Sequence, residues 1–161
     1  MQEKSKRFRT VKFSFETDGG TYRERYMIVD NHIPLFRVNQ WLDLKGMRKV
    51  GTGQEYAKKL TVFLNWLDNC GVTFENATNR HVRQFLHSLI FGDLQDCKIK
   101  SFQTTVSSST LRSYITVITG FYKWLDSICQ TEMIWDTKHI QTISFSRQRK
   151  KKLQPRLSQN C

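Results

Sequence analysis

Apolar and aromatic residues recur every three or four positions in three separate stretches of the chain, residues 52–71, 78–92 and 108–125. In chain order, these positions are Tyr56, Leu60, Phe63, Leu64, Leu67, Val82, Phe85, Leu86, Leu89, Leu111, Tyr114, Ile115, Ile118, Phe121, Tyr122 and Leu125. Spacing of this kind puts all the apolar side chains of a stretch on one side of an α-helix. Each helix must then bury that side against another element. The sequence therefore predicts a mainly α fold with three long helices around one core.

The ends of these helices are also marked in the sequence. Thr52 is followed three positions later by Glu55, which is the spacing of a capping box, and Gly71 follows the last apolar residue. Thr78 can cap the second helix, and Gly92 lies just beyond its end. The third helix is expected to begin at Ser108 or Ser109, after a loop of residues 93–106 that has no clear period.

The N-terminal part of the chain has a different period. Val11, Phe13 and Phe15 alternate with polar residues, residues 18–20 read Asp-Gly-Gly, and residues 22–29 are rich in aromatic and β-branched side chains. Alternation on both sides of an Asp-Gly turn predicts a β-hairpin. Because an isolated hairpin is marginal in water, it must pack on the rest of the protein or on a ligand.

A fourth, shorter helix is predicted between the hairpin and the long helices. Pro34 suits its first turn because proline has no amide hydrogen to lose there, and Gly46 can end it. Its apolar side consists of Leu35, Val38, Trp41 and Leu42. The expected fold is thus a four-helix bundle preceded by a small N-terminal β-hairpin.

The net charge points to a polyanionic partner. The 161 residues include 26 Lys and Arg against 14 Asp and Glu, a net charge of +12. Residues 137–161 alone hold seven basic and no acidic side chains. Nucleic acid and an anionic membrane surface both fit such a charge. The membrane is disfavoured, because the basic run has few apolar neighbours to insert beside it.

No feature of the chain predicts a metal or cofactor site. The cysteines lie about thirty residues apart without a Cys-x-x-Cys pair, at Cys70, Cys97, Cys129 and Cys161. His81 and His87 are six positions apart and cannot share a helix face as ligands. Residues 1–9 lack the apolar stretch of a secretory signal, and no segment has the length of a membrane span. We expect free thiols and a cytoplasmic protein without a cofactor.

The three helical stretches together resemble the core-binding domain of tyrosine recombinases of the phage-integrase type. The resemblance covers about residues 22–126, and residues 26–42 are similar to the lead-in of integrases carried by transposons and other mobile elements. It is carried by Thr52, Tyr56, Leu60, Phe63, Trp66, Leu67, then Thr78, Val82, Phe85, Leu86, then Ser109, Thr110, Leu111, Phe121, Tyr122, Trp124 and Leu125.

The resemblance implies a SAM-like orthogonal bundle that forms one half of a clamp around double-stranded DNA. It implies an N-terminal hairpin arm in residues 1–33, a DNA-binding domain in residues 34–136 and a basic tail or interdomain linker in residues 137–161. In the family, a second domain cuts DNA with an Arg, a Lys, a His-x-x-Arg pair and a Tyr nucleophile. None of the four histidines here is followed by Arg at that spacing. We therefore expect a bacterial or mobile-element protein that binds DNA at the nucleoid, with no catalysis of its own.

Basic residues at the helix surfaces are the candidate DNA contacts, because Lys and Arg gain affinity by displacing counterions from phosphates. Arg112, Thr116 and Thr119 follow one side of the last helix and are the candidates for contacts to base edges. The full predicted set is Arg48, Lys49, Lys58, Lys59, Arg80, Arg83, Arg112, Thr116, Thr119, Lys123, Arg147, Arg149, Lys150, Lys151 and Lys152.

Three other functions are compatible with the sequence. In the first, the chain is a piece of a complete recombinase. In the second, it is a regulator that occupies the recombination site or pairs with the full enzyme. In the third, it is a basic helical module that binds proteins and not DNA. The first two predict other recombinase protomers as partners, and none requires a small-molecule substrate. The sequence also leaves open whether the hairpin of residues 11–29 reads DNA or only braces the bundle.

Overall fold

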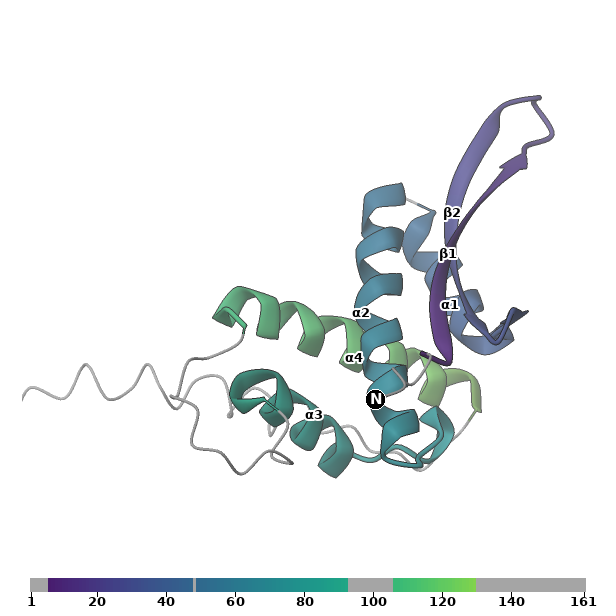
Figure 1. Ribbon diagram of the computed structural model, residues 1–161. Coiled ribbons are helices and arrows are strands. Elements are labelled where there is room, and N and C mark those ends of the chain that lie inside the picture. The colour runs from purple at the N-terminus through teal and green to yellow at the C-terminus, as the bar shows by residue number, and fades with distance from the viewer. Residues whose placement is uncertain (1–5, 48, 93–105, 130–161) are drawn as a thin grey trace, which may run out of the picture.

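The computed structural model describes residues 6–47, 49–92 and 106–129. These residues form a mainly helical fold with a small three-stranded antiparallel sheet at the N-terminus, as the sequence predicts (Figure 1). The strands are β1 (Phe8–Glu16), β2 (Tyr22–Asp30) and β3 (Ile33–Pro34). The helices are α1 (Phe36–Gly46), α2 (Val50–Asn69), the 3-10 turn η1 (Phe74–Asn76), α3 (Asn79–Phe91) and α4 (Ser108–Cys129). Residues 93–105 of the predicted loop and the predicted tail lie outside the described residues.

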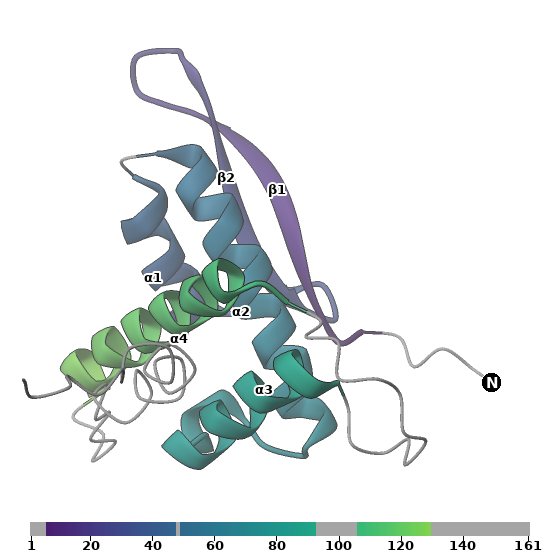
Figure 2. The same ribbon diagram turned by 90° about the vertical axis from the view of Figure 1, so that its left-hand side faces the viewer.

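Helix α2 lies in the middle of the molecule. The hairpin of β1 and β2 runs along one side of α2, and α3 and most of α4 lie on the other side (Figure 1). Both views show the tip of the hairpin, residues 17–21, extending beyond the helices (Figures 1 and 2). The hairpin is therefore partly an element of the body and partly a projecting arm.

Aromatic rings from all four helices meet in the core. Phe63 of α2 has its ring centroid 5.0 Å from that of Phe85 of α3 and 6.3 Å from that of Tyr122 of α4. Phe121 of α4 packs edge-on against Trp41 of α1 at 5.5 Å. All these rings are at most 1% exposed. The predicted apolar stripes are confirmed as the core, except that Leu35, Tyr56, Leu89 and Tyr114 are only partly buried at its margin.

The hairpin is confirmed, with β1 and β2 paired from Phe8 opposite Asp30 to Glu16 opposite Tyr22. Two asparagines attach its base to the helices. Asn39 of α1 accepts a bond from the amide of Ile28 at 2.7 Å and donates to the carbonyl of that residue at 2.9 Å. Asn65 of α2 makes the same pair of bonds with Phe8, at 3.0 and 2.9 Å. Each side-chain amide thus bonds both backbone groups of one strand residue and attaches the hairpin to a helix.

Two predicted helix starts are wrong. Pro34 is not in the first turn of a helix; it lies in β3 opposite Val29, because Leu35 stays extended and donates its amide to the carbonyl of Ile28. Helix α2 begins two residues before Thr52, because Lys49 is the last extended residue. Glu55 consequently forms no capping box and binds Lys59 at 2.7 Å.

The other predicted helix ends are confirmed. Thr78 precedes α3, and its amide donates to Nδ1 of His81 at 3.0 Å, so histidine takes the place that Glu or Gln has in the usual capping box. Gly71 follows α2 with a φ of +70°, and the amide of Val72 reaches back to the carbonyl of Leu67 at 3.0 Å. This is the Schellman arrangement that favours glycine after a helix.

The contact between α1 and α2 depends on two glycines. A Cβ atom added to Gly53 would lie 3.2 Å from the Cα of Gly46, whereas one added to Gly51 would meet nothing within 4 Å. We expect Gly53→Val to lower the free energy of unfolding by about 1–3 kcal/mol, because the helices must separate. Gly51→Val, the same change two residues away, should be neutral or slightly stabilising. Urea unfolding of both variants checks this, and equal midpoints would contradict it.

Candidate nucleic-acid interface

Helix α3 presents two arginines away from the core. Arg80 and Arg83 are exposed, as are Gln84 and His87 on the same side of the helix. The opposite side buries Val82, Phe85 and Leu86. Both predicted arginines of this helix are therefore accessible to a polyanion.

Helix α4 exposes Arg112, Thr116 and Lys123 along one side, as predicted. The predicted contact of Thr119 with a base edge is wrong. Thr119 is only 8% exposed, and its hydroxyl donates to the carbonyl of Ile115 at 2.6 Å. A base edge cannot reach this hydroxyl. The hydroxyl of Thr116 also donates within the helix, to the carbonyl of Arg112 at 3.0 Å, so towards a ligand its exposed oxygen serves as an acceptor.

The two helices lie next to each other (Figure 2). The rings of Phe85 and Tyr114 contact each other between them, with centroids 5.5 Å apart. Helix α3 contains no acidic residue, and Asp126 is the one carboxylate in the sequence of α4. Four cations against one carboxylate give this pair of helices a formal charge of +3. We call the exposed residues Arg80, Arg83, Arg112, Thr116 and Lys123 the α3–α4 surface.

The predicted lysine pair of α2 shares one carboxylate, that of Glu55. Lys59 has a side chain that is only 15% exposed, and its ammonium lies 2.7 Å from a carboxylate oxygen of Glu55. Hydrogen bonding to Lys59 holds the pKa of Glu55 below its usual range. Lys58 is exposed and its ammonium lies 4.0 Å from the same carboxylate. Of this pair, Lys58 remains a candidate contact, whereas Lys59 is engaged with its neighbour.

The Glu55–Lys59 pair lies close to the start of α4. Burial raises the pKa of Tyr114, while the charge of Lys59 lowers it and that of Glu55 raises it. Glu55 and Lys59 of α2 therefore lie near Tyr114 of α4.

The remaining predicted contacts precede α2 or belong to the basic run after residue 146. Lys49 is exposed at the N-terminal end of α2. Arg48 and the basic run Arg147, Arg149, Lys150, Lys151 and Lys152 lie outside the described residues. Their contribution to DNA binding stays a prediction.

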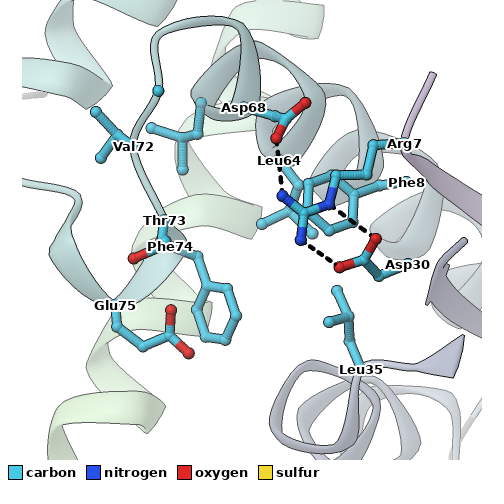
Figure 3. Close-up of a pocket in the computed structure, with 12 residues that line it drawn as sticks. Arg7, Phe8, Asp30, Leu35, Leu64, Asp68, Val72, Thr73, Phe74 and Glu75 are labelled. Atoms are coloured by element: carbon cyan, nitrogen blue, oxygen red, sulfur yellow. Dashed lines mark hydrogen bonds and ion pairs between the residues drawn. The ribbon is translucent and has the colours of Figure 1, made fainter. Parts of the chain in front are cut away.

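A pocket of about 360 Å³ lies at the base of the hairpin, where the sequence predicts no site (Figure 3). Arg7 forms one wall and binds Asp30 at 2.6 Å and Asp68 at 3.0 Å; Phe74 and Glu75 lie across from its guanidinium. Hydrogen bonds to Arg7 lower the pKa of Asp30. These ion pairs connect the start of β1 to the end of β2 and to α2. The arrangement suits a structural connection. These residues do not form the pair of general acid and general base that a catalytic site would need.

Tyr122, one of the two tyrosines that the sequence places on the apolar side of the last helix, is fully buried. Its hydroxyl donates to the carbonyl of Phe74 at 2.8 Å, and burial raises its pKa. It therefore attaches η1 to α4. Among the described residues, no three His, Cys, Asp or Glu side chains gather as a metal site would require.

The structure also exposes cations that the sequence analysis did not single out. Arg9 of β1 and Arg23 of β2 are exposed on the hairpin. The period of two that predicts the strands also applies to charged residues, and it is the signal that could have placed Arg9 and Arg23 on one face.

Comparisons with known proteins give no match: neither a family model, nor a curated protein, nor a solved structure is similar to this chain. Within residues 6–47, 49–92 and 106–129, no helix has the length and apolar character needed to cross a membrane.

Proposed function

We propose that the protein is a duplex-DNA-binding module equivalent to the core-binding half of a tyrosine recombinase. The observation that carries the proposal is the α3–α4 surface, on which two neighbouring helices expose four cations and share a single carboxylate. Double-stranded DNA is the polyanion with the matching density of charge, since it carries one phosphate per about 1.7 Å of its axis.

On this proposal the residues of the surface have separate roles. Arg80, Arg83 and Lys123 contact phosphates and position the helices on the duplex. Arg112 reads a base edge in the major groove, because its fork of donors matches two acceptors of guanine. Thr116 accepts a hydrogen bond beside it. Thr119, being buried, stabilises α4 instead of contacting DNA.

The four helices, on the same proposal, are a SAM-like orthogonal bundle, and the complete recombinase closes around DNA with this bundle on one side. The support is the ordered match of helix motifs in residues 52–125. Their aliphatic residues and Phe63, Phe85, Phe121 and Tyr122 lie in the core, whereas Tyr56, Trp66 and Trp124 are partly buried at its margin. Strand cleavage belongs to a separate catalytic domain, and the module acts at the nucleoid, where the recombination site lies.

The proposal predicts a strong dependence of binding on salt. Five exposed cations, the four of the α3–α4 surface and Lys58, should give a slope of log K against log salt of about −4 or steeper, at roughly 0.9 per phosphate. We expect affinity for a fluorescent duplex to fall several hundredfold, roughly, between 50 and 200 mM salt. Fluorescence anisotropy of the full chain measures both quantities. A flat salt profile, or no binding at the lowest salt, would favour the helical protein-interaction module and exclude this proposal.

A further inference from the structure

The charges of the hairpin are sorted by the pleat of its strands. Residues directly opposite each other in an antiparallel pair lie on the same face, and neighbours in sequence lie on opposite faces. One face therefore carries three arginines, Arg9, Arg23 and Arg25, because Arg23 is opposite Phe15 and Arg25 is opposite Phe13. The other face carries all three carboxylates of these strands, Glu16, Glu24 and Asp30.

The face with the arginines, which we call the arginine face, consists of Arg9, Val11, Phe13, Phe15, Arg23, Arg25, Met27 and Val29. No carboxylate of β1 or β2 shares it. On the opposite face, Lys12 is already bound to Glu24 at 2.6 Å. Within these two strands, the excess of positive charge is therefore on the arginine face; Asp43 of α1 lies close enough to Arg25 for the two charges to interact.

Much of the arginine face is accessible, although Val29 at its base is buried. Arg9 and Arg23 are exposed, and the apolar side chains of Val11 and Phe15 are 39% and 38% exposed. The opposite face is held against α2 at its base, where Thr10 bonds to Thr61 at 2.8 Å and Ile28 is fully buried.

An aromatic ring supports one of the arginines, Arg25. The rings of Phe13 and Phe15 lie side by side with centroids 6.1 Å apart, and the guanidinium of Arg25 lies 5.7 Å from the ring of Phe15. The stem of Arg25 also packs near Gly46, at the end of α1. Guanidinium groups held over apolar rings remain extended and bind phosphates with less loss of side-chain freedom.

We propose that the arginine face is a second DNA-contacting surface, distinct from the α3–α4 surface. This inference rests on the proposed function, because the ligand is the same duplex. A two-stranded ribbon fits the major groove, which is about 12 Å wide. Nine residues of strand extend about 30 Å, close to one turn of DNA. The hairpin therefore lengthens the contact along the DNA instead of strengthening a contact made by the helices.

Two single substitutions on the same hairpin test this. Arg23→Ala removes an exposed cation from the arginine face, and Lys12→Ala removes a cation from the other face. For Arg23→Ala, we expect affinity for a fluorescent duplex to fall about three- to tenfold and the salt slope to decrease by about 1. Lys12→Ala should bind like the wild-type chain. Thermal unfolding followed by circular dichroism should be unchanged for Arg23→Ala, since the side chain is exposed.

The outcomes separate the two proposals. If the wild-type chain does not bind duplex DNA, the proposed function fails and this inference fails with it. If the wild-type chain binds with a steep salt dependence while Arg23→Ala and Lys12→Ala both match it, only the inference is overturned and the hairpin is a brace for the bundle. Equal losses in the two variants would also overturn it, because they would indicate an effect of net charge and not of one face.

Discussion

Phe121→Ala should lower the free energy of unfolding by about 3–5 kcal/mol, the largest loss of stability that we expect from a single truncation. Phe121 is fully buried, and its ring lies next to four others, those of Trp41, Phe74, Tyr122 and Trp124. These rings belong to α1, η1 and α4. Removing the central ring leaves a cavity that rings from three elements cannot all move to fill.

Phe36→Ala is the matched control for this experiment. Phe36 is 76% exposed, so the same truncation should change the free energy of unfolding by less than about 0.5 kcal/mol. Chemical denaturation followed by circular dichroism compares the two variants. If the two variants unfolded at the same denaturant concentration, the aromatic cluster would not be the core of this fold.

The long helices could be predicted because their stability depends on burial, and burial follows the spacing of apolar residues. Leu60, Phe63, Phe85 and Phe121 lie in the core where that spacing places them. The hairpin could be predicted for a similar reason, since its alternation has a period of two. Both patterns are local in sequence and need no knowledge of the partner element.

The predicted start of the first helix is wrong because a tertiary bond decides the local backbone. Pro34 suits a first turn, but Ile28 accepts the amide of Leu35 and draws Pro34 into the sheet. Asn39 and Asn65 show the same limit. Their sequence context gives no sign that each binds the backbone of a strand residue. Asn65 binds Phe8, which is 57 residues away in sequence.

The candidate site was predicted in part. Arg80, Arg83, Arg112 and Lys123 are exposed, as helical spacing predicts. Lys59 and Thr119 could not be judged from sequence, because their availability depends on an ion pair and on packing. Thr119 lies on the polar side of the α4 spacing and is nevertheless covered. The arginine face was missed although strand alternation defines it.

The second large effect concerns DNA affinity and the α3–α4 surface. The double variant Arg112→Ala/Lys123→Ala should bind a duplex about ten- to a hundredfold more weakly at moderate salt, with a salt slope reduced by about 2. Both side chains are exposed, so the free energy of unfolding should change little. The charge-matched control is Lys12→Ala/Lys45→Ala, which removes two cations from the hairpin and α1. There Lys12 binds Glu24, and Lys45 lies over the ring of Trp41.

The most direct measurement is an anisotropy titration of one fluorescent duplex with these two double variants and the wild-type chain, at matched salt. The proposed DNA-binding role of α3 and α4 predicts that the control retains nearly wild-type affinity while Arg112→Ala/Lys123→Ala loses at least about tenfold. Equal affinities for the two double variants would contradict it, since they would mean that duplex DNA does not contact this surface.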